Sequence, residues 1–188
     1  MVPAPTVKVK GGALLSRFAF VRDQIGEDGL QRVLARLSEA DRAECARIHT
    51  GGWYPFALNE RIDSAIAAEV GLGDDIFLLM GEKSAIQNLT GAHRAMVSDG
   101  DPHGLLRRTP QIYQMYYDAG RRTYEKTGER SAVLRTYDAP TFSLHDCLTV
   151  VGWHRKAIAM CGGRKASVVE TKCRARGGEL CEYVCSWM

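Results

Sequence analysis

The spacing of apolar residues changes near Pro110, and this change constrains the fold of the chain more than any other feature. Before it, apolar residues such as Leu14, Phe18 and Val21 recur with the period of an amphipathic helix. After it, short runs rich in tyrosine, threonine and valine are typical of strands. The sequence therefore predicts an α+β fold, in which N-terminal helices pack on a C-terminal antiparallel sheet that is crossed by one helix.

Glycines and capping residues indicate where the first helices begin and end. Gly26 is expected to end the first helix, and a second is expected to begin at about Asp28. Ser38 is a suitable N-cap for the third, with Asp41 placed to answer it as in a capping box. A long helix is expected over about 75–98.

The second half of the chain is expected to form strands around a single helix. The stretches 113–124 and 131–137 are predicted to be strands separated by a turn. Ser143 is expected to cap the crossing helix. A hairpin with strands over about 165–173 and 180–186 is expected to close the fold.

The composition indicates one ordinary globular domain. We expect residues 1–11 to form a tail, with a short strand from Val7 to Lys10 as one alternative at its end, and residues 12–188 to form a single domain. The net charge of +3 is too small to indicate nucleic-acid binding, and no segment approaches the ~20 apolar residues that span a bilayer. The N-terminus has no apolar run typical of a signal peptide, so we expect a cytoplasmic protein with reduced cysteines.

Six cysteines are the strongest candidates for chemistry. In a reducing compartment they are expected to be metal ligands or buried thiols rather than disulfides. Cys45, Cys161 and Cys185 are best explained as small apolar core residues. Cys147 lies in the first turn after Ser143, where the helix dipole favours a thiolate, and thiolates are ligands that suit zinc.

The terminal hairpin brings two further cysteines within reach of one ion. Cys173 and Cys181 flank its turn, and as a cross-strand pair they would lie on one face about 5 Å apart. Glu170 precedes Cys173 by three residues, so in a regular strand it points to the opposite face. It can join the site only if the strand bulges or ends near Thr171. Spacing alone supports a zinc site and a set of buried thiols equally.

These residues carry a resemblance to a known family. The segment from Asp146 to Gly152 and the segment from Val169 to Tyr183 resemble the 4-vinyl reductase-type domain. The end of that domain has a Glu, a Cys three residues later and a second Cys eight residues after the first. Another Cys precedes the Glu by 23 residues. The steps in this chain are the same, from 147 to 170, then to 173 and 181.

The resemblance implies a zinc site with four ligands, which are Cys147, Glu170, Cys173 and Cys181. Phenol-responsive transcription activators of this family bind zinc through that set. Because four protein ligands saturate the ion, the zinc is expected to be structural and to clamp the hairpin to the preceding helix. The family is related in fold to haem-based nitric-oxide sensors and to vesicle-tethering trafficking subunits. From Gly12 to Trp187 the chain also resembles a myxobacterial paralogous family without an assigned activity.

We therefore expect a stand-alone zinc-containing sensory or ligand-binding domain, and not an enzyme. Its ligand would be a small apolar or aromatic molecule, and it would signal to a partner protein. The alternative is an interaction module that dimerises or docks through its helices around a structural zinc. A weaker alternative is an enzyme, which requires that Glu170 not be a ligand so that the zinc keeps an open position. A cavity above about 300 Å³ lined by aromatic residues would favour the sensor.

The remaining polar and aromatic residues form no recognised motif. A structural or surface role is expected for each of the five histidines, which are His49, His93, His103, His145 and His154. The tyrosines of the 113–124 stretch, together with Trp53 and Trp153, could line a ligand pocket or form part of the core. A core role is the favoured interpretation.

Overall fold

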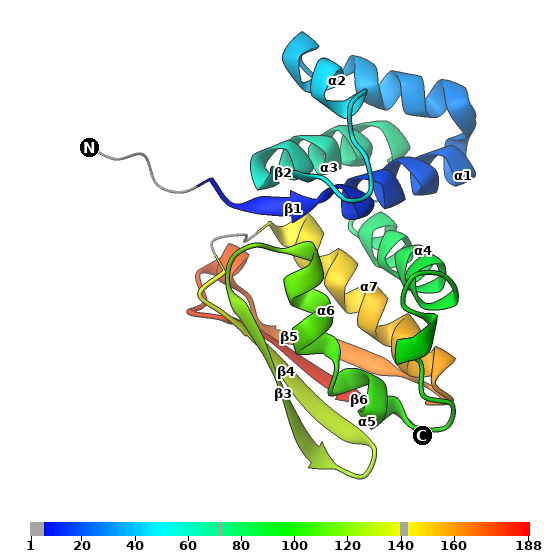
Figure 1. Ribbon diagram of the computed structural model, residues 1–188, viewed down its shortest axis with the longest axis vertical. Helices are drawn as coiled ribbons and strands as arrows, with labels where there is room; N and C mark the ends of the chain where they lie inside the picture. Colours follow the sequence, from blue (N-terminus) through cyan, green and yellow to red (C-terminus); the bar gives the residue numbers. More distant parts are fainter. Residues whose placement is uncertain (1–5, 72, 140–142) are drawn as a thin grey trace.

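A four-stranded sheet and a set of helices make up the computed structural model of the chain, as the predicted α+β class requires (Figure 1). The structure describes residues 6–71, 73–139 and 143–188. The helices are α1 (Gly11–Ala35), α2 (Glu39–Cys45), α3 (Phe56–Val70), α4 (Asp75–Thr90), α5 (Pro102–Leu106), α6 (Thr109–Tyr116) and α7 (Leu144–Met160). The strands are β1 (Lys8–Lys10), β2 (Trp53–Pro55), β3 (Arg121–Gly128), β4 (Ser131–Tyr137), β5 (Ser167–Lys172) and β6 (Cys181–Ser186). The 3-10 helices η1 (Arg94–Met96) and η2 (Arg174–Arg176) complete the described elements.

The larger sheet is antiparallel and has the strand order β3-β4-β6-β5. β6 therefore lies between β4 and β5, and α7 connects β4 to β5 across one face of the sheet (Figure 1). α7 contacts β5 and β6 on one side and α4 on the other. The prediction that one helix crosses the sheet is confirmed.

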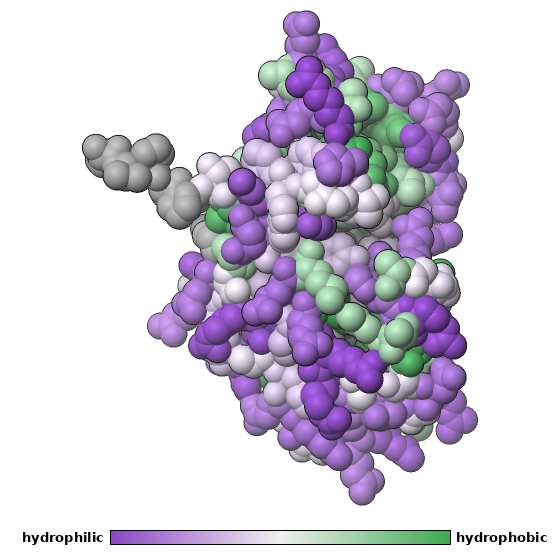
Figure 2. Space-filling model, viewed as in Figure 1, coloured by the Kyte–Doolittle hydropathy of each residue, from purple (hydrophilic) through white to green (hydrophobic). Residues whose placement is uncertain are grey.

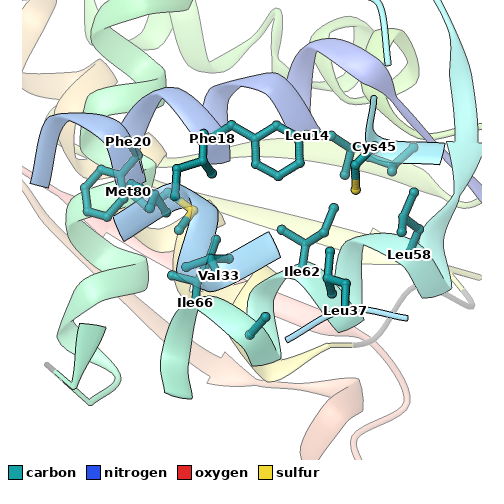
Figure 3. Packing of buried hydrophobic residues seen from close by; sticks show 14 of the residues in the cluster. Leu14, Phe18, Phe20, Val33, Leu37, Cys45, Leu58, Ile62, Ile66 and Met80 are labelled. Carbon is teal, nitrogen blue, oxygen red and sulfur yellow. The ribbon is translucent and has the colours of Figure 1, made fainter. Parts of the chain in front are cut away.

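The N-terminal helices enclose an apolar core of their own (Figure 3). Gly26, with a φ of 74°, interrupts α1 with a kink at the predicted helix end. The two arms of α1 contribute Leu14 and Val33 to the same core as Ile62 of α3. The Ser38 side chain caps α2 by accepting a hydrogen bond from the next turn, as predicted.

One predicted strand is partly a helix. Residues 109–116 form α6, and the strand β3 covers only residues 121–128. Tyr113, Tyr116 and Tyr117 recur at three- and four-residue spacing, so a helix places them on one side. Packing of that side against the neighbouring helices outweighs the strand preference of tyrosine.

Two other boundaries differ from expectation. The helix expected to reach residue 98 ends at Thr90, where Gly91 follows. The segment 1–11, interpreted as a tail with a short strand from Val7 to Lys10 as one alternative at its end, includes β1, which pairs with β2. Val9 of β1 is fully buried in the N-terminal core, so this part of the segment belongs to the fold.

Helices α4 and α7 cross at two glycines. A Cβ atom at Gly81 would lie 2.0 Å from the backbone oxygen of Thr149, and one at Gly152 would lie 2.0 Å from that of Leu78. No side chain can occupy either position unless the backbones separate. The two glycines therefore set the distance between the N-terminal helices and the helix that covers the sheet.

Replacement of Gly152 by alanine is expected to lower the free energy of unfolding by about 1–3 kcal/mol, because the added methyl forces α7 away from α4. Urea denaturation followed by circular dichroism measures the change. Gly51→Ala is the control, since its new Cβ would be 3.9 Å from the nearest atom. A Gly152→Ala protein as stable as Gly51→Ala would show that the close crossing does not contribute to stability.

A buried ion pair joins three helices. Arg17 of α1 is 4% exposed and contacts Asp63 of α3 at 2.7 Å and Asp146 of α7 at 3.0 Å. The Tyr117 hydroxyl donates to the Asp146 carboxylate. Burial opposes the charge on Arg17, but the two carboxylates outweigh it and raise the pKa of the guanidinium. The network connects the N-terminal helices to the first turn of α7.

Candidate metal centre and ligand cavity

The four predicted ligands lie together beside the N-terminal end of α7. One ligand atom from each of Cys147, Glu170, Cys173 and Cys181 lies within 4.8 Å of the other three. The Sγ atom of Cys147 is 3.8 Å from those of Cys173 and Cys181. Three sulfur atoms and a carboxylate around one point form a donor set suited to a soft or borderline metal ion.

Glu170 joins the cluster through a β-bulge. It pairs with Tyr183, whereas Lys172 pairs with Glu182, so the register of β5 against β6 shifts at Thr171. Such a bulge is the condition under which Glu170 can share a face of the strand with Cys173. Both carboxylate oxygens of Glu170 are buried and have no hydrogen-bonded partner among the described residues. Because a buried carboxylate without partners is costly, the arrangement calls for a cation.

Among the three thiols of this cluster, Cys181 rather than Cys147 ionises most readily. A hydrogen bond from Cys147 lowers the pKa of Cys181 to about 7, and the backbone N–H of Arg174 acts in the same direction. The same contact with Cys181, together with burial, raises the pKa of Cys147. Burial also raises the pKa of Cys173. In the absence of a metal ion, the contact with Cys181 and burial thus outweigh the helix dipole at Cys147. The thiolate form of Cys147 as a metal ligand stays a prediction.

The other three cysteines are buried apolar residues, as predicted. Cys45 belongs to the N-terminal core, and Cys161 packs with residues of α4 and α5. Cys185 of β6 belongs to the core between the sheet and α7. Burial raises the pKa of each of these thiols. They have the character of small hydrophobic side chains rather than of ligands.

A separate cavity lies where α1, α4, α6, α7 and β3 meet. Its volume is about 80 Å³. The lining residues are Ala13, Arg17, Ser84, Asn88, Thr109, Ile112, Tyr113, Tyr116, Tyr117, Arg122, Thr149, Val150, Trp153 and His154. Aromatic residues that were assigned to the core thus also line a cavity, although its volume is below the expected size for a drug-like ligand.

His154 is the imidazole of this cavity and is 1% exposed. Its Nδ1 lies 2.8 Å from the backbone oxygen of Val150, and its Nε2 lies 3.5 Å from Nη1 of Arg122. Burial and the charge of Arg122 lower the pKa of His154 to about 3. The imidazole is therefore neutral, with Nδ1 as the donor and Nε2 as an acceptor.

No model of a known protein family and no curated protein sequence matches the chain. Solved structures of H-NOX proteins have a similar fold. The H-NOX protein from S. oneidensis in the Fe(II)NO ligation state has a TM-score of 0.76 at 15% identity, covering 95% of this chain and 99% of that one. The Fe(II) unliganded H-NOX protein from K. algicida has a TM-score of 0.71 at 15% identity, covering 95% and 96%. The expected relation in fold to haem-based nitric-oxide sensors is confirmed.

The comparison contradicts structural zinc as the cofactor. The neighbouring structures are haem-binding domains, so the cofactor associated with this fold is haem rather than zinc. The zinc prediction rested on the spacing of four side chains and on a sequence resemblance that the comparisons do not confirm. A haem site in this chain must therefore be tested on its own residues.

The cavity does not fit haem. A haem iron needs a histidine nitrogen that faces an open apolar pocket. His154 is the histidine of the cavity, but its Nε2 faces the guanidinium of Arg122 and its Nδ1 is bonded to the backbone. A cavity of about 80 Å³ is also far smaller than the ~300–1,000 Å³ of pockets for large ligands.

The other histidines do not provide a haem site either. His93 borders a groove of about 490 Å³ between α1, α4 and α6, but the groove is open to solvent and His93 bonds the Tyr116 hydroxyl. Both ring nitrogens of His103 are hydrogen-bonded. His49 is exposed, and His145 stacks on a phenylalanine of α4. Among the residues described, no imidazole faces a pocket that would hold the macrocycle.

Sequence reasoning missed the polar residues of the cavity. Arg17 and Arg122 lie in different halves of the chain, and no motif marks either of them. A structural or surface role was predicted for His154. The one local signal was its position on α7 next to Trp153, which also lines the cavity.

None of the described helices has the length and apolar character of a membrane span.

Proposed function

We propose that the chain is a sensory domain that binds a small molecule in the cavity beside α7 and signals to a partner protein. The observation that supports this proposal is the position of the cavity. Its walls come from α1 and α4 on one side and from α6, α7 and β3 on the other. A ligand there contacts both halves of the fold and can change how they pack. The H-NOX fold supports this role, because haem-binding sensors use the same architecture around a ligand.

Apolar and aromatic walls favour an apolar portion in the ligand. Ile112, Val150, Tyr116 and Trp153 are among the residues that form these walls. The volume restricts the ligand to a few non-hydrogen atoms, since an engineered cavity of about 150 Å³ holds benzene.

We propose that the chain binds this ligand and does not catalyse a reaction. A cytoplasmic location is also proposed, and the six cysteines, which form no disulfide, support it.

The cluster of Cys147, Glu170, Cys173 and Cys181 is proposed to hold a metal ion whose identity metal analysis must supply. The support is the convergence of the four donors and the unpaired Glu170 carboxylate. Such an ion would fix the hairpin of β5 and β6 to α7. The ligand spacing also supports the proposed relationship to 4-vinyl reductase-type domains, and the resemblance from residue 12 to 187 supports one to the myxobacterial family.

A cavity-filling substitution tests the sensory function. Ala13→Leu adds a larger side chain to the cavity wall and is expected to abolish binding of a small probe such as isopropanol. Binding is read from the indole N–H resonance of Trp153, which lines the cavity. Ala19→Leu is the matched control, because Ala19 lies on the same helix but borders the outer groove.

The expected result is a saturable shift of the Trp153 resonance in the wild type and in Ala19→Leu, and none in Ala13→Leu. The resonances of Trp53 and Trp187 serve as internal controls, since neither residue lines the cavity. Probes that shift all three resonances alike, or that bind Ala13→Leu unchanged, would contradict the assignment of the cavity as the binding site.

A second candidate is an interaction module that forms a homodimer or docks on a partner. Leu79 and Ile86 lie two turns apart on α4 and are 42% and 36% exposed, which favours a contact through this helix. On the face seen in Figure 2, however, hydrophobic residues form short strips between hydrophilic ones rather than one broad patch. Sedimentation of the wild type and of Leu79→Glu distinguishes a self-associating chain from a monomer.

A further inference from the structure

Arg122 is a half-buried cation at the wall of the cavity. Its Nε donates to the Thr136 hydroxyl at 3.0 Å, and its Nη1 faces Nε2 of His154 at 3.5 Å. Its guanidinium carbon lies 4.8 Å from the ring centre of Tyr113 and 5.6 Å from that of Tyr183. Neutral groups and aromatic faces thus hold the guanidinium in one orientation at the cavity.

No carboxylate among the described residues lies within ion-pair distance of Arg122. The buried Arg17 contacts two carboxylates, and Arg135 on the neighbouring strand also contacts two. The described lining of the cavity contains no Asp or Glu. No described carboxylate therefore balances the positive charge of Arg122 at the cavity wall.

His154 does not offset the positive charge of Arg122 and adds none of its own. An imidazolium beside Arg122 would repel it, but the low pKa of His154 keeps the ring neutral. Its Nε2 accepts from one amino group of Arg122, whereas the other amino group, Nη2, has no hydrogen-bonded partner among the described residues. A guanidinium fork with a free amino group is suited to a planar carboxylate.

We propose that the cavity binds a short-chain carboxylate, with its oxygens on Arg122 and its apolar end against Tyr116 and Trp153. The proposal rests on the proposed sensory function and adds the charge and chemical class of the ligand. A cavity of about 80 Å³ suits about three or four non-hydrogen atoms, by comparison with the benzene cavity of about 150 Å³. Formate and acetate have this size and shape.

The test compares acetate with its neutral isostere acetamide in the wild type and two variants. Titrations at constant ionic strength are read from the Trp153 indole resonance. Acetate is expected to bind at least about tenfold more tightly than acetamide, since hydrogen bonds to a charged group are the stronger ones. Arg122→Gln is expected to remove this preference, and Arg122→Lys to retain part of it, because lysine keeps the charge but loses the fork.

Arg121→Gln is the matched control. Arg121 is the adjacent residue on β3, but its guanidinium packs over Tyr137 and does not line the cavity. It is expected to bind acetate as the wild type does. Equal affinity for acetate and acetamide, or an acetate affinity unchanged in Arg122→Gln, would overturn the proposal. If isopropanol shifts the Trp153 resonance and acetate does not, the sensory function stands and the carboxylate proposal fails. If neither probe shifts it, the sensory function fails as well.

Discussion

Replacement of Arg17 by methionine is expected to lower the free energy of unfolding by about 3–5 kcal/mol. The substitution removes the cation that pairs Asp63 of α3 with Asp146 of α7, and both carboxylates stay buried. Methionine fills a similar volume, so the loss arises from uncompensated charge rather than from a void. Urea denaturation at neutral pH measures it, with fluorescence and circular dichroism as separate probes.

Arg32→Met is the matched control, because it removes an arginine from the same helix. Arg32 contacts Glu69, but its side chain is 57% exposed, so a cost below about 1 kcal/mol is expected. An equal loss in the free energy of unfolding for the two variants would show that the buried network stabilises the fold no more than an exposed ion pair does. The additional substitutions Asp63→Asn and Asp146→Asn in Arg17→Met should recover part of the loss, since they remove the unpaired charges.

Substitution of Glu170 by glutamine is expected to change stability in opposite directions with and without metal. In the metal-free protein the variant should be more stable than the wild type by about 1 kcal/mol, because a buried charge without partners becomes neutral. In the metal-loaded protein it should be less stable. A lost ligand that weakens binding by about tenfold removes about 1.4 kcal/mol of stabilisation at saturating metal.

Thermal unfolding with and without a strong chelator, together with metal content by mass spectrometry, measures both effects. Cobalt(II) is a suitable probe, because thiolate ligation gives it characteristic absorption bands. Glu179→Gln is the control, since Glu179 is an exposed carboxylate in the turn of the same hairpin. The metal proposal is wrong if the purified protein holds no metal and cobalt(II) gives no thiolate band. Glu170 is not a ligand if its substitution changes stability equally in both states.

Features that depend on neighbours in the chain were predictable. The caps at Ser38 and Ser143, the interruption at Gly26 and the two strands of the hairpin follow from local conformational preferences. The bulge at Thr171 could be deduced as a condition for Glu170 to reach the cysteines, because strand parity is a fixed geometric rule. Tyrosine was misleading around residue 113, since its strand preference is weak and packing reversed it.

The sequence by itself determined the α+β class and most element boundaries, because these depend on periodicity, capping and spacing. The set of four side chains that meet beside α7 came from the family resemblance, since spacing alone did not select Glu170. Tertiary structure alone decided the chemistry of the cavity. Arg17 and Asp146 are 129 residues apart, and Arg122 and His154 are 32 apart. Contacts over such separations depend on how whole helices pack, which no local pattern encodes. Burial then set the protonation of His154 and left the charge of Arg122 for a ligand to balance.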